Sequence, residues 1–422
     1  MGSDAFTVLQ APYVPPDCCS SVFRAVRAGH MGCVVRYPTS KLLEVDGQGK
    51  SVLHVAAKHG NLEFVDYILK EAPVLLDFHN QTQETPLLIA TAFGHFNLVQ
   101  RFLQGPQSEV LRRVLHRDVN GTSCLMSALA HNDNTIALYL LRRFGKKLAM
   151  LANEVEMLPI HVAASRGNLD FLRIVVKYDH SMVNHQDIYG CTPAVYAVQG
   201  GSLACLRYLI EKAKATIGCL TSKGQSLLHV AALSSQFNIC RWLLQKFGTQ
   251  AILWQTLDNA NVIHCASYSG NVPSLRLLME PWSKRKKKLV LSQRDSRGNT
   301  PLHLAVINGH IATVQCLLEF GANLFLENNK KQTPLAIAHL RNNPKMMRLL
   351  GQHSDESKSG ISSSGYSSSA KGHPLKSVGS FLLNMNLQKM NETATQTEQA
   401  EHYWDEAWAA VSELDQVLAA HS

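Results

Sequence analysis

The sequence predicts an all-α fold of stacked helix–turn–helix units, and three observations support this prediction. A sequence pattern recurs about every 33 residues, an alanine follows each unit start at a fixed distance, and a Gly, Asn or Ser stands where each first helix should end. One helix pair cannot bury its own apolar faces, but a stack of pairs can. The 422 residues are therefore expected to form a repeat array rather than several closed globular domains.

The unit starts are mostly residues that favour the N-terminus of a helix. Ser, Thr and Asn side chains accept hydrogen bonds from the free amides of a first helical turn, and Pro is favoured just after them. We place the starts at Ser20, Ser51, Thr85, Ser123, Leu158, Thr192, Ser226, Asn261, Thr300 and Thr333. Only Leu158 lacks a side chain that can cap a helix. Pro follows at Pro86, Pro159, Pro193, Pro301 and Pro334.

Alanine occupies the same place in every unit, five residues after the start. A side chain this small lets neighbouring helices approach to about 8–10 Å, so these positions should form the seam between units. They are Ala25, Ala56, Ala90, Ala128, Ala163, Ala197, Ala231, Ala266, Ala305 and Ala338. The first helix should then end at Gly29, Gly60, Gly94, Gly167, Gly201, Gly270 and Gly309, with Asn132, Ser235 and Asn342 replacing glycine elsewhere.

The run Thr300-Pro-Leu-His-Leu-Ala, repeated at this period, resembles the ankyrin repeat over roughly residues 20–350. The resemblance implies an ankyrin solenoid of about ten units whose helix pairs are joined by β-turn fingers. Asp and Gly suit such tight turns, and they recur as Asp46, Asp118, Asp187 and Asp295 with Gly49, Gly121, Gly190 and Gly298. A second similarity links the stretch from Leu158 and the run after Cys191 to the ankyrin regions of espin-type and synphilin-type scaffolds.

The composition predicts further segments on either side of the array. Residues 1–19 should be a flexible N-terminus, residues 20–350 the solenoid and residues 351–397 a Ser-rich disordered linker. Residues 398–420 should form an acidic amphipathic helix, because its apolar side chains follow a helical period. This stripe consists of Trp404, Trp408, Val411, Leu414 and Leu418. It is expected to dock on a partner as a second docking element; the alternatives are that it folds back on the repeats or is an unstructured acidic tail.

No catalytic or cofactor-binding motif occurs in the sequence, so we expect neither an enzyme nor a cofactor. His54, His161, His229, His264 and His303 recur once per repeat, which indicates a structural role. No Cys-x-x-Cys pair is present and no Cys/His ligand cluster is visible, so we also expect no metal site and reduced cysteines. No apolar run reaches the roughly 18 residues of a membrane helix.

The expected function is that of a non-catalytic scaffold or adaptor that binds other proteins, with no small-molecule substrate. On the concave face that the ankyrin resemblance implies, the binding residues would be Lys58, His59, Phe93, His131, Arg166, Tyr189, Lys223, Tyr268 and Arg297. An inserted loop carries a basic cluster, namely Lys284, Arg285, Lys286, Lys287 and Lys288. It is either a solvated loop, a nuclear import signal, or a surface for phosphoinositide or nucleic-acid phosphates. The expected location is the cytoplasm; the alternative function is a nuclear regulatory cofactor.

Overall fold

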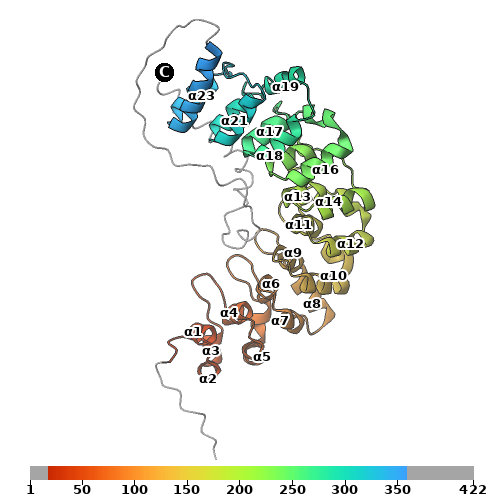
Figure 1. Ribbon diagram of the computed structural model, residues 1–422. Coiled ribbons are helices and arrows are strands. Elements are labelled where there is room, and N and C mark those ends of the chain that lie inside the picture. Colours follow the sequence, from red (N-terminus) through yellow and green to blue (C-terminus); the bar gives the residue numbers. More distant parts are fainter. Residues whose placement is uncertain (1–17, 359–422) are drawn as a thin grey trace, which may run out of the picture. The chain divides into compact units, whose positions relative to one another are not determined.

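The structure is a computed structural model that describes residues 18–358. Figure 1 shows the helices of these residues, coloured along the sequence from red to blue. They belong to two compact units that divide between Glu154 and Val155. Within the described range the secondary structure is helical, with only isolated β-bridges, which agrees with the all-α prediction. Residues 1–17, residues 359–397 of the expected linker and the whole expected acidic helix, with its stripe from Trp404 to Leu418, lie outside the described range.

The helices follow one another as pairs along each unit. The first helices of the pairs are α1 (Val22–Arg27), α4 (Val52–His59), α6 (Pro86–Ala92) and α9 (Cys124–Ala130), then α11 (Pro159–Arg166), α13 (Pro193–Gln199), α15 (Leu227–Leu233), α17 (Val262–Ser269), α20 (Pro301–Ile307) and α22 (Pro334–Leu340). The second helices are α2 (Met31–Val34), α5 (Leu62–Glu71), α7 (Phe96–Phe102) and α10 (Asn134–Ala149), then α12 (Leu169–Tyr178), α14 (Leu203–Arg207) with the π-helix η3 (Tyr208–Lys212), α16 (Phe237–Phe247), α18 (Val272–Met279), α21 (Ile311–Glu319) and α23 (Pro344–Lys358).

Short helices also connect some pairs. They are α3 (Thr39–Leu42), α8 (Gln107–Leu115) and α19 (Lys284–Leu291), with the 3-10 helices η1 (Pro73–Asp77), η2 (His180–Asn184) and η4 (Thr249–Leu253). The last helix, α23, continues to Lys358 and so passes the expected end of the solenoid at residue 350. No helix of the described range is both long and apolar enough to cross a membrane.

The predicted capping residues begin the first helices. From Ser51 onward each predicted start is an N-cap, and at Thr85 the side-chain hydroxyl accepts the Leu88 amide at 3.3 Å. Only the first start is shifted: the cap of α1 is Ser21 rather than Ser20, and its hydroxyl accepts the Arg24 amide at 3.2 Å.

The alanine positions form the predicted seam. Consecutive first helices within each unit pack on one another, as α4 does on α6 and α11 does on α13. Every one of the predicted alanines is fully buried, at 0% exposure. Because these alanines are fully buried between helices, a larger side chain at any of these positions would push the helices apart.

The predicted helix-ending residues all adopt a left-handed backbone conformation. Gly60 has a φ of 73°, and the residues that replace glycine share this conformation, with a φ of 61° at Asn132, 58° at Ser235 and 49° at Asn342. Asparagine tolerates this region, whereas serine is strained there. The turn geometry is therefore the same whether or not the sequence provides a glycine.

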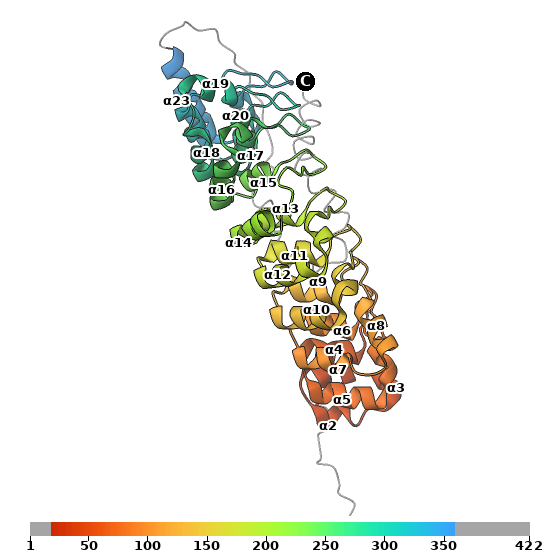
Figure 2. The same cartoon turned by 90° about the vertical axis from the view of Figure 1, so that its right-hand side faces the viewer.

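The fingers between helix pairs are held by side chain and backbone together. In each predicted finger the aspartate accepts two backbone amides; Asp187, for example, accepts those of Tyr189 at 3.0 Å and Cys191 at 2.7 Å. Successive fingers are then joined by backbone hydrogen bonds, such as Leu257 N to Lys223 O at 3.1 Å. Figure 2 shows the fingers of the second unit projecting together from one edge of its helices.

Candidate protein-interaction surface

The recurring histidines are structural, as their spacing predicts. In His303 the Nδ1 atom accepts the backbone amide of the cap residue Thr300 at 3.1 Å, while Nε2 donates to the carbonyl of Gln332 in the next finger at 3.1 Å. The same Nε2 bond to the following finger is made by His54, His161, His229 and His264. Both ring nitrogens of each histidine form hydrogen bonds. These histidines therefore hold neighbouring repeats together and are not free for catalysis.

Burial keeps these imidazoles neutral. It is the main reason why the pKa values of His161, His229, His264 and His303 are lowered to about 4 from 6.5, and the pKa of His54 is also lowered. A neutral ring with Nε2 protonated fits the bonding pattern, because Nδ1 must accept and Nε2 must donate.

In the first unit, four of the predicted binding residues are exposed at the ends of first helices. Lys58 and His59 end α4, Phe93 follows α6, and His131 follows α9. Phe93 is 51% exposed, and the Lys58 Nζ atom lies 5.3 Å from the centroid of its ring. The backbone there is fixed, because His95 Nε2 donates to the Lys58 carbonyl at 2.9 Å. An exposed aromatic ring with an adjacent cation on a rigid backbone is a suitable protein-binding anchor.

In the second unit, the predicted binding residues are less exposed than those of the first unit. All five are half-buried: Arg166, Tyr189, Lys223, Tyr268 and Arg297. Burial raises the pKa of Tyr268 to about 12 and lowers the pKa of Arg166. Several of them contribute backbone carbonyls to the stack, as Tyr268 does toward His310 Nε2 at 2.9 Å. Their role in binding stays a prediction.

The residues that do protrude from the fingers were not predicted. They stand directly after the first residue of the finger turn, where Leu257 is 75% exposed, Ile188 is 46% exposed and Val119 is 43% exposed. The sequence does contain a signal for these residues. Each is an apolar residue directly after the first Asp or Thr of a tight turn, where there is no core for it to enter. Leu257 and Ile188 belong to fingers of the second unit.

The basic cluster is helical, which corrects the expectation of a loop. Lys284 to Lys288 form the start of α19, and this helix is anchored by the buried Val290 and Leu291. Four of the five basic side chains are exposed, whereas Lys287 is half-buried with its Nζ atom 4.7 Å from the ring centroid of Phe320.

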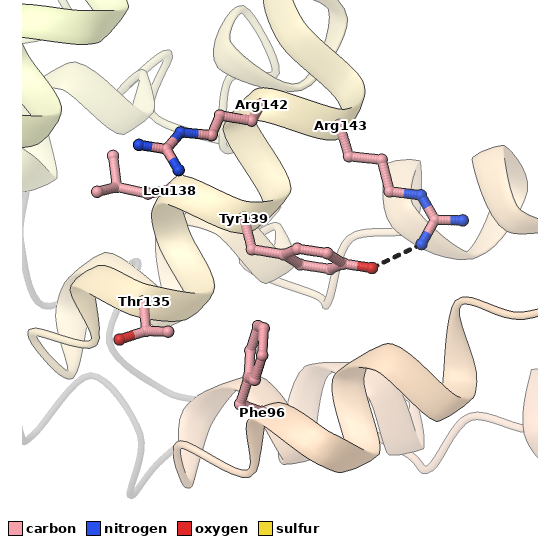
Figure 3. A pocket seen from close by; sticks show the side chains of 6 residues that line it. All are labelled: Phe96, Thr135, Leu138, Tyr139, Arg142 and Arg143. Atoms are coloured by element: carbon pink, nitrogen blue, oxygen red, sulfur yellow. Dashed lines mark hydrogen bonds between the residues drawn. The ribbon is translucent and has the colours of Figure 1, made fainter.

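A shallow hollow lies between second helices of the first unit. Figure 3 shows its lining from α7 and α10, where the rings of Phe96 and Tyr139 meet edge to face at a centroid distance of 5.3 Å. Arg143 donates to the Tyr139 hydroxyl at 2.7 Å and to the Leu103 carbonyl at 3.0 Å. The sequence did not point to this hollow, because its residues come from different repeats. Arg143 is engaged within the protein, so the hollow presents mainly apolar surface.

A cluster of side chains of metal-ligating types, which the sequence analysis did not find, lies at the start of the described residues. The donor atoms of Cys18, Cys19, His30 and Cys33 all lie within 4.8 Å of one another. His30 Nδ1 is 3.1 Å from the sulfur of Cys18 and 3.3 Å from that of Cys19. The sequence hides this cluster because its spacing differs from paired Cys-x-x-Cys motifs; the turn after α1 brings His30 and Cys33 back to the two cysteines.

Comparison with known proteins agrees with this architecture. A family model described as ankyrin repeats in three copies matches residues 53–150, 145–218, 160–251 and 263–359, and a second ankyrin model matches residues 228–279. The helices α1, α2 and α3 lie before the matched residues.

Similar proteins come from several organisms. Synphilin-1 of Mus musculus is 26% identical over 177 residues, which are 42% of this chain and 15% of that protein. Protein ACCELERATED CELL DEATH 6 of Arabidopsis thaliana is 26% identical over 336 residues, covering 67% of this chain and 50% of that protein.

The probable 26S proteasome regulatory subunit p28 of Saccharomyces cerevisiae is 26% identical over 194 residues, covering 46% of this chain and 83% of that protein. The chain thus matches half or less of the length of synphilin-1 and of protein ACCELERATED CELL DEATH 6. The similarity to synphilin-type ankyrin regions is confirmed. Because the family model matches most of the chain, the protein belongs to the ankyrin repeat family.

Proposed function

We propose that this protein is a non-catalytic scaffold or adaptor that captures another protein through the ends of its first helices and the tips of its fingers. Ankyrin repeat proteins generally bind other proteins, and one relative is named as a regulatory subunit of the proteasome. The observation that carries the proposal is the Lys58–Phe93 pair, which holds an exposed ring and a cation side by side on a fixed backbone.

The second unit supports the same function with a different chemistry. Ile188 and Leu257 expose apolar side chains on finger tips, although both fingers are tied into the backbone ladder. A partner would bury these side chains without having to order them first, which lowers the entropic cost of binding. We name the pair Lys58 and Phe93 the helix-end anchor, and the pair Ile188 and Leu257 the finger-tip anchor.

The experiment compares affinity purification of the full chain with that of two double variants, followed by quantitative mass spectrometry. The variants are Lys58→Ala with Phe93→Ala and Ile188→Ser with Leu257→Ser. We expect at least one co-purifying protein to bind roughly 30-fold more weakly when an anchor is lost, which is the size of a hot-spot effect.

The matched control removes one lysine and one exposed apolar side chain elsewhere in the first unit. Lys70 and Val74 are both exposed, and Val74 is 65% exposed, so Lys70→Ala with Val74→Ala alters a comparable surface. Proteins that bind the control and the wild type equally, but not the anchor variants, support the proposal. If all three variants retain every partner, the anchors are not the binding surface.

A second candidate function, nuclear regulation, is favoured by the exposed basic residues of α19. Lys284, Arg285 and Lys288 are exposed, so replacing them by Ala removes charge and leaves the contact of Lys287 with Phe320 intact. A fluorescent full chain that moves from the nucleus to the cytoplasm on this change would support import through α19. An unchanged distribution rejects it and leaves the cytoplasmic scaffold. The docking helix around Trp404 and Trp408 stays a prediction in either case.

A further inference from the structure

The N-terminal end of the described chain gathers three thiols and one imidazole in a small space. Cys18 and Cys19 immediately precede α1, His30 caps α2, and Cys33 lies within α2. Their donor atoms are all within 4.8 Å of one another. All ten cysteines of the chain are described and are free thiols, and only these come together with a histidine in this way within the described residues.

The arrangement has the composition and size of a tetrahedral zinc site. Zn–S bonds of about 2.3 Å and Zn–N bonds of about 2.0–2.1 Å place neighbouring ligand atoms roughly 3.5–3.8 Å apart around the ion. The distances of 3.1 Å and 3.3 Å from His30 Nδ1 to the sulfurs of Cys18 and Cys19 are close to this, and the remaining pairs fall below 4.8 Å. Three soft thiolates with one imidazole favour zinc over harder cations.

The surrounding structure holds the ligands in place. Cys19 and Cys33 are buried, at 9% and 8% exposure, and Tyr37 Oη donates to the Cys19 carbonyl at 2.8 Å. The His30 backbone amide donates to the Ala25 carbonyl at 2.9 Å, which fixes the turn from which the imidazole projects. The protein supplies all four ligands, and a closed set of this kind is typical of structural rather than catalytic zinc.

The helices at this end of the described chain are short. α1 has six residues, and α2 and α3 have four each, so all three are too short to be stable alone. α1 packs on α4 and on α2, and α2 contains Cys33 and has His30 as its N-cap. A cross-link between the start of α1 and α2 would therefore contribute directly to the folding of this terminal unit.

We propose that Cys18, Cys19, His30 and Cys33 bind one structural zinc ion, which fixes the N-terminal cap of the ankyrin array. Zinc binding replaces the protons of the three thiols by the ion and leaves no ligand position open for a substrate. The proposal is independent of which partner the anchors bind.

The experiment measures zinc in the full chain after purification under reducing conditions and removal of any affinity tag. We expect one zinc ion per chain by elemental mass spectrometry. Replacement by Co²⁺ should give the near-ultraviolet thiolate-to-cobalt bands and the intense visible bands of a tetrahedral site. These spectra report the ligand set and do not depend on any partner.

Variants assign the ligands. Cys33→Ser and His30→Ala should weaken zinc binding by more than the roughly 10–100-fold that loss of an outer-shell partner causes. His30→Cys should retain the ion, because four thiolates also form a zinc site. Cys205→Ser is the matched control, since Cys205 is a buried cysteine of α14 in the other compact unit. Far-ultraviolet circular dichroism verifies that the rest of the array remains folded.

Several results would overturn the proposal. Zinc that is absent or far below one per chain would do so, as would zinc retained by both Cys33→Ser and His30→Ala. A freshly prepared chain that lacks two titratable thiols and is lighter by two hydrogens, with both restored by reductant, would show a disulfide in place of the metal site.

Discussion

His161 accepts the backbone amide of Leu158 at 3.0 Å through its Nδ1 atom, although Leu158 has no side-chain oxygen with which to begin a helix. In the other repeats with this histidine, a side-chain oxygen of the Ser, Thr or Asn cap residue also lies 2.7–2.8 Å from the histidine Nδ1 atom. At Leu158 the histidine alone satisfies the cap residue, and its Nε2 atom simultaneously donates to the His185 carbonyl at 3.0 Å. In a capping box, the cap side chain and the side chain three residues later each accept one backbone amide. At Leu158 the imidazole still accepts its amide, so leucine is tolerated there.

The alanine seam predicts a large effect from a small increase in side-chain volume. Ala163→Leu or Ala305→Leu should destabilise the protein by about 1–3 kcal/mol, because both positions are fully buried between first helices and overpacking moves the backbone. Thermal melting followed by circular dichroism measures the effect. Ala204→Leu is the control, since Ala204 is an exposed residue within α14. Equal melting temperatures for all three variants would contradict the seam.

The close packing of successive fingers leaves no room for a Cβ atom at one glycine. A Cβ atom at Gly121 would lie 2.6 Å from the Glu154 amide nitrogen and 2.7 Å from the Asn153 Cα atom, and the residue has a φ of 73°. Gly121→Ala should therefore lower the free energy of unfolding by more than about 1 kcal/mol. At Gly47 a Cβ atom would meet nothing within 4 Å, so Gly47→Ala is the control and should be nearly neutral. A neutral Gly121→Ala would show that the ladder is not closely packed.

The strained serine predicts a stabilising substitution. Ser235 has a φ of 58°, a conformation that costs a non-glycine residue about 1–2 kcal/mol. Glycine avoids this strain, but it makes the unfolded chain more flexible, which costs roughly 0.5–1 kcal/mol of stability. Ser235→Gly should thus raise stability by about 0.5–1 kcal/mol. Asn132→Gly should give less, since asparagine tolerates a φ of 61° better. Urea unfolding of both variants measures the difference; a destabilised Ser235→Gly would contradict this account.

The sequence predicts the features that recur in every helix pair. The capping residues, the alanines and the left-handed turns depend on contacts that recur in every helix pair, so their spacing reveals them. Exposure of individual side chains does not follow the repeat in the same way: Tyr268 is half-buried near a helix end, whereas Leu257 is exposed on a finger.

Features that occur only once could not be found from periodicity. The helix α19 forms because Val290 and Leu291 can be buried after the basic residues, which favour helices in any case. The cluster of Cys18, Cys19, His30 and Cys33 needs the turn after α1, and no other described unit contains a comparable set. The apolar hollow needs Phe96 and Tyr139 from different repeats.

The buried histidines predict that stability falls in mild acid. The imidazoles of His161, His229, His264 and His303 have pKa values of about 4 when folded and 6.5 as the ordinary value. Between pH 6.5 and about 4 the unfolded chain therefore binds protons that the folded chain does not. The stability contributed by neutral histidines is complete above pH 6.5 and is lost as the pH falls through this window, by up to about 3 kcal/mol for each residue.

The buried finger carboxyls act with the opposite sign. Burial raises the pKa values of Asp118, Asp187 and Asp295 above 3.8, so their protonation favours the folded state as the pH falls. The histidine effect should dominate near about pH 6, because this pH is close to the ordinary histidine pKa of 6.5 and far above the ordinary carboxyl pKa of 3.8.

Urea unfolding midpoints between pH 7.5 and 4.5 measure the histidine effect, and His303→Gln separates it from the carboxyl effect. This variant should be less stable at pH 7.5, because the Thr300 amide and the Gln332 carbonyl lose their partner. Its midpoint should also depend less on pH than that of the wild type, since one titrating group is removed. Parallel pH profiles for the two proteins would mean that His303 is protonated at the same pH in the folded and the unfolded chain, contrary to its burial.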